Sequence, residues 1–422
     1  MKFQTPTGMH DLFEEELELF RKIEKACREI AEFYDFKRIE TPILEDARLF
    51  ERGVGLTTDI VEKEMYVLRT KGGDRLALRP EGTAPVVRAY IQHGMQSLPK
   101  PVKLWYLGPF FRYERPQAGR YRQFYQFGFE SIGANSPVID AEIILIFYNI
   151  LKKLGFKNLV VEVNSIGDSQ CRPYFKKILV NYLRSHQSAL CANCKRRLRK
   201  NPLRVLDCKE EKCQRVRKNA PQIVDHLCKE CHDHFKSLLE FLDTLELPYN
   251  LNPYLVRGLD YYTKTVFEIS VETEEGKIQG ALAGGGRYDG LIKLLGGKET
   301  PACGGAAGIE RIVNLMKLKH KLPSKKAKPK IFLAQVGELP KRYGLKLYEE
   351  FRQAKIKVIQ SLHKDSLASQ LKLADKLGVK YVLILAQKEA LEGKVIVREM
   401  TTGKQKILPI EKIVREMKKK IK

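Results

Sequence analysis

Apolar residues recur at helical spacing near the start of the chain. Residues 11–34 place Leu12, Leu19, Ile23 and Ile30 on one face, and polar residues fill the positions between them. Acidic residues crowd the first turns and basic residues follow, which is the order that the helix dipole favours. The pattern predicts an amphipathic helix with one buried face.

Further along, the pattern changes to the alternation and short apolar runs that are typical of strands. Strands are expected at 36–41, 102–113, 123–132, 159–164, 265–271 and 277–283, and helices at 140–154 and 308–319. Between these segments, residues 168–235 are basic, rich in cysteine and helix-like. This stretch has the character of an insertion into a domain built from residues 1–167 and 236–322.

The last quarter of the chain alternates regularly between strands and helices. Strands are expected at 331–336, 356–360, 380–386 and 393–399, and helices at 341–354 and 366–377. This alternation is typical of a compact α/β module, which we place at residues 330–422. Residues 320–330 contain Pro, Ser and a run of Lys, and they are expected to form a linker.

Composition excludes several classes of protein. Of the 422 residues, 43% are hydrophobic and 30% charged, which excludes a disordered or low-complexity chain. No apolar run approaches the roughly 20 residues that span a bilayer, and the N-terminus has no apolar signal region. We therefore expect a cytoplasmic protein with no membrane contact. The nine cysteines are then expected to be reduced thiols or metal ligands.

The net charge of +25 is concentrated in two parts of the chain. Residues 330–422 hold 22 Lys and Arg against 10 Asp and Glu, and residues 168–235 hold 16 against 7. Basic patches on separable modules favour a polyanionic partner, most simply a nucleic acid. A lysine-rich, solubilising surface is an equally acceptable interpretation of charge alone.

The strand at 123–132 carries the most informative alternation. One face holds Tyr125, Phe127 and Phe129. The other face holds Gln126, Gly128 and Glu130. The aromatic face belongs in a core. The other face has a carboxylate and an amide beside a glycine, which suits close contact with a polar small molecule better than a solvent-facing strand.

Other segments supply groups for charged ligands. Four arginines near the turn after 102–113 suit a phosphate chain, because guanidinium groups pair with phosphate oxygens. They are Arg112, Arg115, Arg120 and Arg122. In residues 78–84, Glu81 and Thr83 offer a carboxylate and a hydroxyl, which together can hold an ammonium group.

Two later segments combine charged side chains with glycine. Residues 255–269 place Arg257, Asp260, Tyr261 and Tyr262 just before a strand. Residues 283–291 contain three consecutive glycines, which indicate a tight backbone approach. The glycine pattern matches neither a Walker loop nor a dinucleotide-binding fingerprint. Small residues also precede Arg311, where a flat ring or a phosphate could approach.

These segments resemble the motifs of one enzyme family. GPFFRYERPQAGRYRQFYQFGFE resembles motif 2 of the class II aminoacyl-tRNA synthetases, GGAAGIER resembles motif 3, and the first helix with RIETPIL resembles motif 1. LVRGLDYYTKTVFE and AGGGRYDGL, together with RPEGTAP, resemble signatures of the histidyl-tRNA synthetases of bacterial type. The resemblance covers nearly the whole chain in the expected order.

The resemblance implies an α+β fold. In the family, an antiparallel catalytic sheet of six or seven strands is flanked by helices, carries an inserted domain, and is followed by an α/β anticodon-binding domain. Motif 1 forms a homodimer interface, which would lie around residues 11–44. The two basic parts of the chain correspond to the insertion and the anticodon-binding domain, where tRNA(His) would be held.

The resemblance also implies a reaction and a set of site residues. Histidine and ATP, with Mg²⁺ on its outer phosphates, would give histidyl-adenylate and pyrophosphate, and histidine would then pass to the 3′-hydroxyl of the terminal adenosine of tRNA. Arg112 and Arg257 match the catalytic residues at the α-phosphate, and Arg120 and Arg311 match the residues that hold the outer phosphates of ATP. For histidine, Glu81, Thr83 and Gln126 match the residues that hold the α-ammonium group. Glu130 and Tyr262 match those that face the imidazole, and Tyr261 and Tyr288 match those that line the pocket. Arg115 and Gln117 match residues that approach the acceptor end of tRNA.

The cysteines of the insertion have the spacing of a zinc site. The expected zinc ligands are Cys191, Cys194, Cys228 and Cys231, with Cys208 and Cys213 as alternatives. Unliganded, reduced thiols are the competing interpretation, since the family does not require a metal here. Cys27, Cys171 and Cys303 fall outside the pattern and are expected in the core.

Two other functions are compatible with parts of these patterns. A regulatory subunit of histidine biosynthesis shares the catalytic fold, but it typically lacks the anticodon-binding domain and the histidine-specific signatures. An RNA-binding protein with an inactive synthetase domain would have no need of Arg112, Arg257 and Arg311. The sequence retains all of these features, which favours the synthetase.

Overall fold

The computed structural model describes residues 3–117, 119–272, 278–319 and 330–421. The chain forms two compact units, Met1–His320 and Lys321–Lys422, which we describe separately. The linker expected at 320–330 lies outside the described residues except for Lys330. None of the helices in the described ranges is long and apolar enough to cross a membrane.

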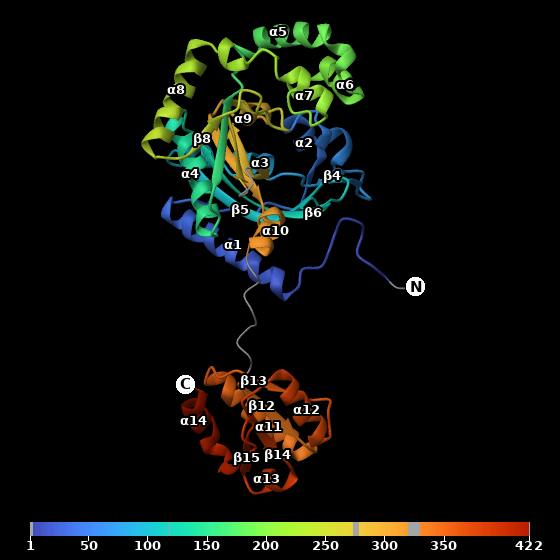
Figure 1. Cartoon of the computed structure of the whole chain (residues 1–422), viewed down its shortest axis with the longest axis vertical. Helices are drawn as coiled ribbons and strands as arrows, with labels where there is room; N and C mark the ends of the chain where they lie inside the picture. Colours follow the sequence, from blue (N-terminus) through green and yellow to red (C-terminus); the bar gives the residue numbers. More distant parts are fainter. Residues whose placement is uncertain (1–2, 118, 273–277, 320–329, 422) are drawn as a thin grey trace. The chain divides into compact units, whose positions relative to one another are not determined.

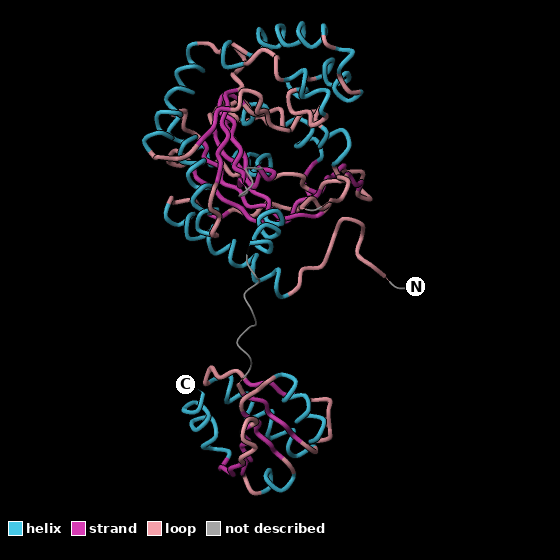
Figure 2. Tube along the Cα trace, in the orientation of Figure 1, coloured by secondary structure: helices cyan, strands magenta, loops and turns pink. Residues whose placement is uncertain are grey.

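An eight-stranded sheet forms the centre of the first unit, with the order β1-β5-β6-β11-β10-β9-β7-β8 (Figures 1 and 2). Its strands are β1 (Lys37–Arg38), β5 (Val102–Phe111), β6 (Gln123–Ile132), β7 (Leu159–Ser165), β8 (Tyr249–Leu251), β9 (Thr263–Glu272), β10 (Ile278–Arg287) and β11 (Ala302–Gly308). The six inner strands pair antiparallel, while the short edge strands β1 and β8 pair parallel to their neighbours. The six antiparallel strands agree with the expected six or seven. The two parallel edge strands bring the total to eight.

One face of this sheet is the aromatic core that the alternation in β6 predicts. Phe127 and Phe129 are fully buried, and the ring of Phe147 stacks on Phe127 at a centroid distance of 5.8 Å. Phe267 of β9 joins the same cluster. Burying rings of this size contributes much of the stability of a core. The polar residues of β6 are therefore turned to the opposite face.

Helices cover the aromatic face. They are α1 (Glu14–Phe33), α4 (Pro137–Lys153) and α10 (Ile309–Lys319). Helix α4 packs on β6, β9, β10 and β11, and α1 packs on both α4 and α10. The predicted face of α1 is confirmed at Leu19 and Ile23, which are buried, whereas Leu12 precedes the helix.

The insertion forms its own group of helices, which lies together beyond one end of the sheet in Figure 1. Its elements are α5 (Arg172–Ser185), η3 (Gln187–Ala189), α6 (Ala192–Lys200), η4 (Pro202–Val205), α7 (Glu211–Arg217), η5 (Ile223–His226) and α8 (Lys229–Thr244). Phe175 and Leu179 of α5 are buried in one core with Cys194 and Leu198 of α6. Helix α8 leaves this group and packs on α4, which returns the chain to the sheet.

A small second sheet and short helices complete the first unit. The sheet has the order β2-β4-β3. These elements are β2 (Leu44–Asp46), α2 (Ala47–Gly53), η1 (Ile60–Glu64), β3 (Val67–Arg69), β4 (Arg75–Leu78), α3 (Thr83–Gln92), η2 (Met95–Ser97) and α9 (Leu291–Leu294). Helix α3 contacts β6, and its N-terminus begins the polar site described below.

The second unit is a five-stranded sheet with helices, in the order β13-β12-β14-β15-β16. Its elements are β12 (Ile331–Gln335), α11 (Glu338–Gln353), β13 (Val358–Gln360), α12 (Leu367–Leu377), β14 (Tyr381–Leu385), α13 (Gln387–Leu391), β15 (Lys394–Glu399), β16 (Gln405–Pro409) and α14 (Ile410–Ile421). The predicted α/β alternation is confirmed up to β15. Three elements were not predicted from the sequence: helix α13 between β14 and β15, strand β16 and helix α14.

Candidate active site

The polar face of β6 holds a buried carboxylate. Glu130 is fully buried, and it accepts hydrogen bonds from the Thr83 hydroxyl at 2.7 Å and the Tyr288 hydroxyl at 2.6 Å. Burial raises the pKa of Glu130 to about 8, against the lowering effect of these two hydrogen bonds. Three segments far apart in the sequence therefore meet at one carboxyl group.

A second buried carboxylate lies at the N-terminus of α3. Glu81 accepts the backbone N–H groups of Thr83 and Ala84, each at 2.8 Å, and the Tyr261 hydroxyl lies at 3.3 Å. The carboxylate satisfies N–H groups that the first helical turn leaves free. Burial raises the pKa of Glu81, and these backbone hydrogen bonds oppose the shift.

Tyrosine rings line the space around the two carboxylates. Tyr261 lies between Tyr262, at a centroid distance of 4.7 Å, and Tyr288, at 5.8 Å. All three are buried, and burial raises the pKa of Tyr262 to about 12. At neutral pH their hydroxyls remain protonated and can both donate and accept hydrogen bonds.

Tyr106 is a member of this pocket that the sequence analysis missed. It lies on β5 directly opposite Gly128 of β6, and its ring is buried. A Cβ atom at Gly82 or Gly128 would overlap the Tyr106 ring. The glycine in the polar face of β6 thus makes room for a neighbouring ring. Tyr106 could have been identified from the pairing of β5 with β6, which places it opposite Gly128.

Arg257 lies on the sheet beside a glycine of the AGGG segment. It forms an ion pair with Glu268 of β9, a partner that the sequence analysis did not identify. A Cβ atom at Gly284 would come within 2.6 Å of the Arg257 guanidinium. Gly284 is therefore needed for close approach, whereas its neighbour Gly285 leaves space for the backbone of β11.

The remaining phosphate-binding candidates surround the loop after β5. Arg112 donates from Nε to the Pro80 carbonyl at 2.8 Å, and Arg112 and Arg120 lie 3.9 and 3.5 Å from Glu114. Arg311 donates to the Ala281 carbonyl at 2.7 Å. Burial lowers the pKa of Arg311, and the positive charge of Arg120 adds to the shift. The three guanidinium groups therefore belong to one positive region.

The two residues expected at the tRNA acceptor end lie outside the buried pocket. Arg115 and Gln117 are exposed in the loop between β5 and β6. The backbone of Gln117 forms an isolated antiparallel bridge with that of Arg120. Gln126 is half-buried on the polar face of β6. The sequence-predicted residues thus divide into a buried pocket, a group of arginines and an exposed loop.

A buried ion pair supports the pocket from behind. Arg287 is fully buried, pairs with Asp140 of α4 at 2.5 Å, and donates to the Ser136 carbonyl at 3.1 Å. His234 of α8 lies 3.4 Å from the same carboxylate. Burial alone would raise the pKa of Asp140, but Arg287 and His234 hold it at about 2. Because Arg287 immediately precedes Tyr288, this network fixes the ring that contacts Glu130.

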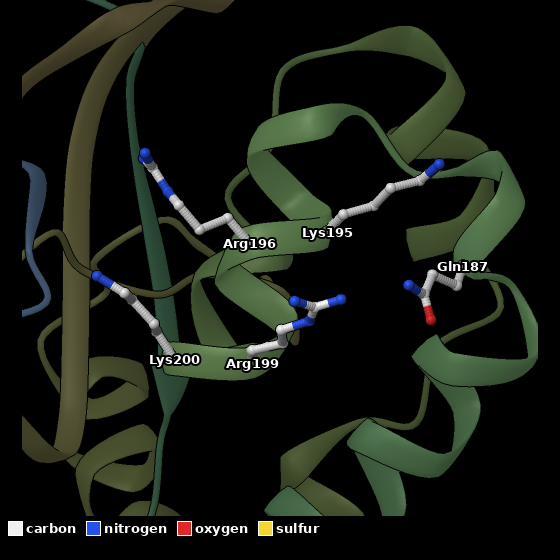
Figure 3. A pocket seen from close by; sticks show the side chains of 5 residues that line it. All are labelled: Gln187, Lys195, Arg196, Arg199 and Lys200. Carbon is white, nitrogen blue, oxygen red and sulfur yellow. The ribbon is translucent and has the colours of Figure 1, made fainter.

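Within the described residues, several cavities involve the insertion. One, of about 180 Å³, is lined by Arg257, Tyr262 and Asp260 on one side and by Arg172 and Arg204 on the other. A second, of about 390 Å³, is formed by the insertion alone (Figure 3). Its lining residues are Gln187, Lys195, Arg196, Arg199 and Lys200, four of which project from α6.

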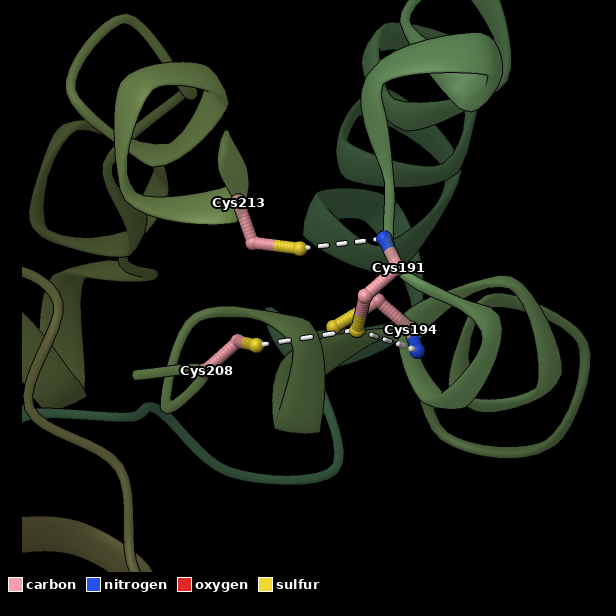
Figure 4. A group of neighbouring side chains, drawn as sticks. All are labelled: Cys191, Cys194, Cys208 and Cys213. Carbon is pink, nitrogen blue, oxygen red and sulfur yellow. Dashed lines mark hydrogen bonds between the residues drawn. The ribbon is translucent and has the colours of Figure 1, made fainter. Parts of the chain in front are cut away.

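The structure corrects the expected grouping of cysteines. Cys191 and Cys194 come together with the alternatives Cys208 and Cys213, and the four sulfur atoms lie within 4.8 Å of one another (Figure 4). The predicted combination with Cys228 and Cys231 is wrong, because those two residues lie at the start of α8. Sequence spacing groups cysteines into pairs but does not determine which pairs the helices bring together.

Cys228 and Cys231 belong to a second group. Their sulfur atoms lie within 4.8 Å of the Cys171 sulfur and of a carboxylate oxygen of Asp168. Cys171, expected in the core, is indeed buried, but it is a member of this group. Cys27 and Cys303 are buried outside both groups, as expected. The described part of the chain thus contains two separate clusters of potential metal ligands.

Comparison with protein-family models matches both units. Residues 8–312 match the model of histidyl-tRNA synthetase, and residues 330–420 match the model of an anticodon-binding domain. The first match contains every residue of the buried pocket and the arginine group.

Similarity to individual proteins extends over the full length. The chain is 47% identical over 405 residues to a histidine–tRNA ligase of Thermodesulfovibrio yellowstonii, covering 96% of each chain. It is 46% identical over 419 residues to that of Dehalococcoides mccartyi, covering 99% of this chain and 100% of the relative. The crystal structure of apo histidyl-tRNA synthetase from S. aureus superposes with a TM-score of 0.77 at 35% identity, covering 98% of this chain and 99% of that one.

Proposed function

The chain belongs to the histidyl-tRNA synthetase family, and from this premise we propose how its own side chains carry the reaction. It is an ATP-dependent histidine–tRNA ligase: it forms histidyl-adenylate and pyrophosphate from histidine and ATP, and transfers histidine to the 3′-hydroxyl of the terminal adenosine of tRNA(His). The assignment of residues to the steps of this reaction is our proposal.

Histidine occupies the pocket between α3 and the polar face of β6. Glu81, with Thr83 and Gln126, holds the α-ammonium group, because a buried carboxylate needs a positive partner. Glu130 and Tyr262 bind the two imidazole nitrogens, and Tyr261 and Tyr288 line the ring. The support for this assignment is that Glu130 is fully buried with two hydroxyl donors, an arrangement suited to a polar ring rather than to an apolar one.

The arginine group stabilises charge in the first step. The histidine carboxylate attacks the α-phosphate of ATP, and negative charge grows on the phosphate oxygens as pyrophosphate leaves. Arg112 and Arg257 act at the α-phosphate, and Arg120 and Arg311 bind the outer phosphates, to which Mg²⁺ arrives bound as part of the substrate. Glu268 and Glu114 hold Arg257 and Arg120 in place before ATP binds, which reduces the reorganisation needed during the reaction.

Transfer RNA binds to both basic parts of the chain. Arg115 and Gln117, on the exposed loop after β5, approach the acceptor end. The cavity of Figure 3 places Lys195, Arg196 and Arg199 on one helix of the insertion, where they suit phosphate contacts. The second unit, which matches an anticodon-binding domain, holds the other end of the tRNA.

Three further features complete the proposal. Two copies form a homodimer through residues 11–44, and the enzyme works in the cytoplasm, where tRNA is charged. The insertion holds a structural zinc ion at Cys191, Cys194, Cys208 and Cys213. The Cys191 and Cys208 sulfurs lie 3.9 Å apart, close to the about 3.8 Å that separates two ligands of a tetrahedral zinc with Zn–S bonds of about 2.3 Å.

Histidine-dependent ATP–pyrophosphate exchange tests the pocket. In Glu81→Gln the KM for histidine should rise roughly tenfold or more, because a charge-assisted hydrogen bond to the ammonium group is lost. Glu240→Gln, a change at an exposed glutamate of α8, is the matched control and should leave the KM unchanged. An unchanged KM in a folded Glu81→Gln protein would contradict the assignment of Glu81.

A further inference from the structure

We propose that the chain has a second zinc site, formed by Asp168, Cys171, Cys228 and Cys231 at the base of the insertion. It is distinct from the tetracysteine site proposed above and shares no ligand with it. We call the two sites the base site and the tetracysteine site.

The geometry of the base site fits a tetrahedral zinc ion. One oxygen of Asp168 and the three sulfur atoms lie within 4.8 Å of one another. The Cys171 sulfur is 3.5 Å from Asp168 Oδ1. Zn–S and Zn–O bonds of about 2.3 and 2.1 Å at a tetrahedral angle place sulfur and oxygen about 3.6 Å apart. No large movement is needed to bring these ligands around one ion.

The ligands come from two similar turns. Asp168 and Cys171 are separated by two residues, as are Cys228 and Cys231, and Cys171 and Cys228 each immediately precede a helix, α5 and α8. Asp168 is already oriented, since its Oδ1 accepts the backbone N–H of Gln170 at 2.9 Å. Three thiolates and one carboxylate are a ligand set suited to zinc.

The base site lies where the insertion leaves the sheet and returns to it. Asp168 follows β7, and Cys228 precedes the helix that packs back on α4. A metal ion there joins the two ends of residues 172–227 and restricts their freedom relative to the sheet. The tetracysteine site, by contrast, joins α6, α7 and the segment between them. The two ions would therefore hold different parts of the insertion.

Contacts beside the base site connect it with the proposed histidine pocket. Arg172, the residue after Cys171, donates a hydrogen bond to the Tyr262 carbonyl. Glu230, between Cys228 and Cys231, accepts a hydrogen bond from Lys264 of β9 at 2.7 Å. A metal ion that holds these two turns therefore also holds the residues that position the backbone at Tyr262 and the start of β9.

Zinc content of the full-length protein, prepared under reducing conditions and measured by elemental analysis, tests the proposal. We expect about two zinc ions per chain in the unaltered protein and about one in Cys228→Ser/Cys231→Ser. The parallel variant Cys208→Ser/Cys213→Ser should also retain about one, and Cys27→Ala, outside both clusters, should retain two. A folded Cys228→Ser/Cys231→Ser protein with undiminished zinc would overturn the base site.

These variants separate the two zinc proposals. If zinc content falls only in Cys208→Ser/Cys213→Ser, the protein has the tetracysteine site and not the base site. If zinc content falls only in Cys228→Ser/Cys231→Ser, the protein has the base site alone. If the base-site double variant does not fold, Asp168→Ala removes one ligand, and titration with a zinc chelator should then show one of the two ions released at a lower chelator concentration than in the unaltered protein. Identical titrations would overturn the proposal.

Hydrogen exchange gives a readout that does not depend on activity. Chelation in the Cys208→Ser/Cys213→Ser variant, which retains only the base site, should speed amide exchange in the first turns of α5 and α8. Exchange in the second unit should not change. Unchanged exchange in both first turns after complete removal of zinc would contradict a structural role for the ion.

Discussion

At the scale of single residues, the site depends on two buried carboxylates with different partners. Glu81 accepts backbone N–H groups of a helix, and Glu130 accepts hydroxyl groups. Both would be costly to bury without these partners, and neither has a cationic side chain within hydrogen-bond distance in the described part of the chain. The proposed occupant, which carries an ammonium group and a ring with two nitrogens, supplies the partners that the protein omits.

The raised pKa of Glu130 predicts a pH-dependent stability. Folding raises this pKa from 4.5 to about 8, so the folded state binds more protons between these values. Stability without ligand should therefore fall as pH rises through this window, by at most about 1.4 kcal/mol per pH unit from this group. Glu130→Gln, which cannot ionise, should show a shallower fall in urea unfolding measured from pH 5 to 8. Parallel pH profiles of the two proteins would show that Glu130 is ionised throughout.

Arg257 is predicted to act on the reaction rather than on histidine binding. Arg257→Ala should slow histidine-dependent pyrophosphate exchange by 10²-fold or more, the loss expected for one preorganised charge donor, with little change in the Kd for histidine. Arg352→Ala, which alters an exposed arginine of α11 in the second unit, is the control. Exchange at the unaltered rate in Arg257→Ala would mean that another group stabilises the α-phosphate.

The residues of the site differ in how far the sequence could reveal them. Glu81, Glu130 and the arginines stand in motifs, so the resemblance locates them. Tyr106 and Glu268 do not stand out, because their roles arise from cross-strand register and from contact between segments. The cysteines illustrate the same limit, since their spacing predicts metal ligands but the packing of α5 to α8 decides which four meet.

At the scale of secondary-structure elements, the glycine-rich strands bring the site together. Gly304 of β11 lies opposite Glu130 of β6, and a Cβ atom there would overlap the Glu130 carboxylate. The sequence of residues 304–308 indicates only small residues before a helix. Strand β11 was not predicted, because glycine and alanine disfavour strands. The long apolar and alternating segments, in contrast, were predicted to within a few residues, since their burial pattern matches their secondary structure.

The link between α4 and β10 is predicted to depend on a single ion pair. Asp140→Asn would leave the buried Arg287 guanidinium with Asp289, at 3.2 Å, as its remaining carboxylate partner. This loss should destabilise the fold by up to about 3–5 kcal/mol. The measurement is the free energy of unfolding in urea. Glu240→Gln removes an exposed ion pair of α8 and should change this free energy little. Equal stabilities of the two variants would contradict a supporting role for the buried pair.

Over the full chain, the residues proposed for adenylation and about half of the net positive charge lie in different parts of the sequence. The residues that we propose for adenylation all lie before residue 312, and residues 330–422 carry +12 of the net charge of +25. The contrast in charge could be predicted from the sequence alone. The partner could not be predicted from charge alone, because a surface that binds a polyanion and a solubilising surface can have the same composition. The resemblance to the family was needed to choose between them.

A protein that ends at Lys328 should therefore charge tRNA more slowly but keep adenylation. Without the phosphate contacts of the second unit, the rate of charging should fall roughly tenfold or more, and its dependence on salt should become flatter. Pyrophosphate exchange should persist as long as the dimer forms, which sedimentation would check. Unchanged charging would show that residues 330–422 do not bind tRNA. Loss of exchange from a folded dimer would show that adenylation depends on them.

We propose that the buried pocket between α3 and β6 recognises the ring nitrogens of histidine. The direct test is the ratio of kcat/KM in pyrophosphate exchange for histidine and for 2-thienylalanine, whose ring has a similar shape but no nitrogen. We expect a ratio on the order of 10⁴ in the unaltered enzyme, because the analogue offers no ring nitrogen to Glu130 and Tyr262. The ratio should be much smaller in Tyr262→Phe and Glu130→Gln. A ratio below about ten in the unaltered enzyme, or one unchanged in both variants, would place recognition of the imidazole elsewhere.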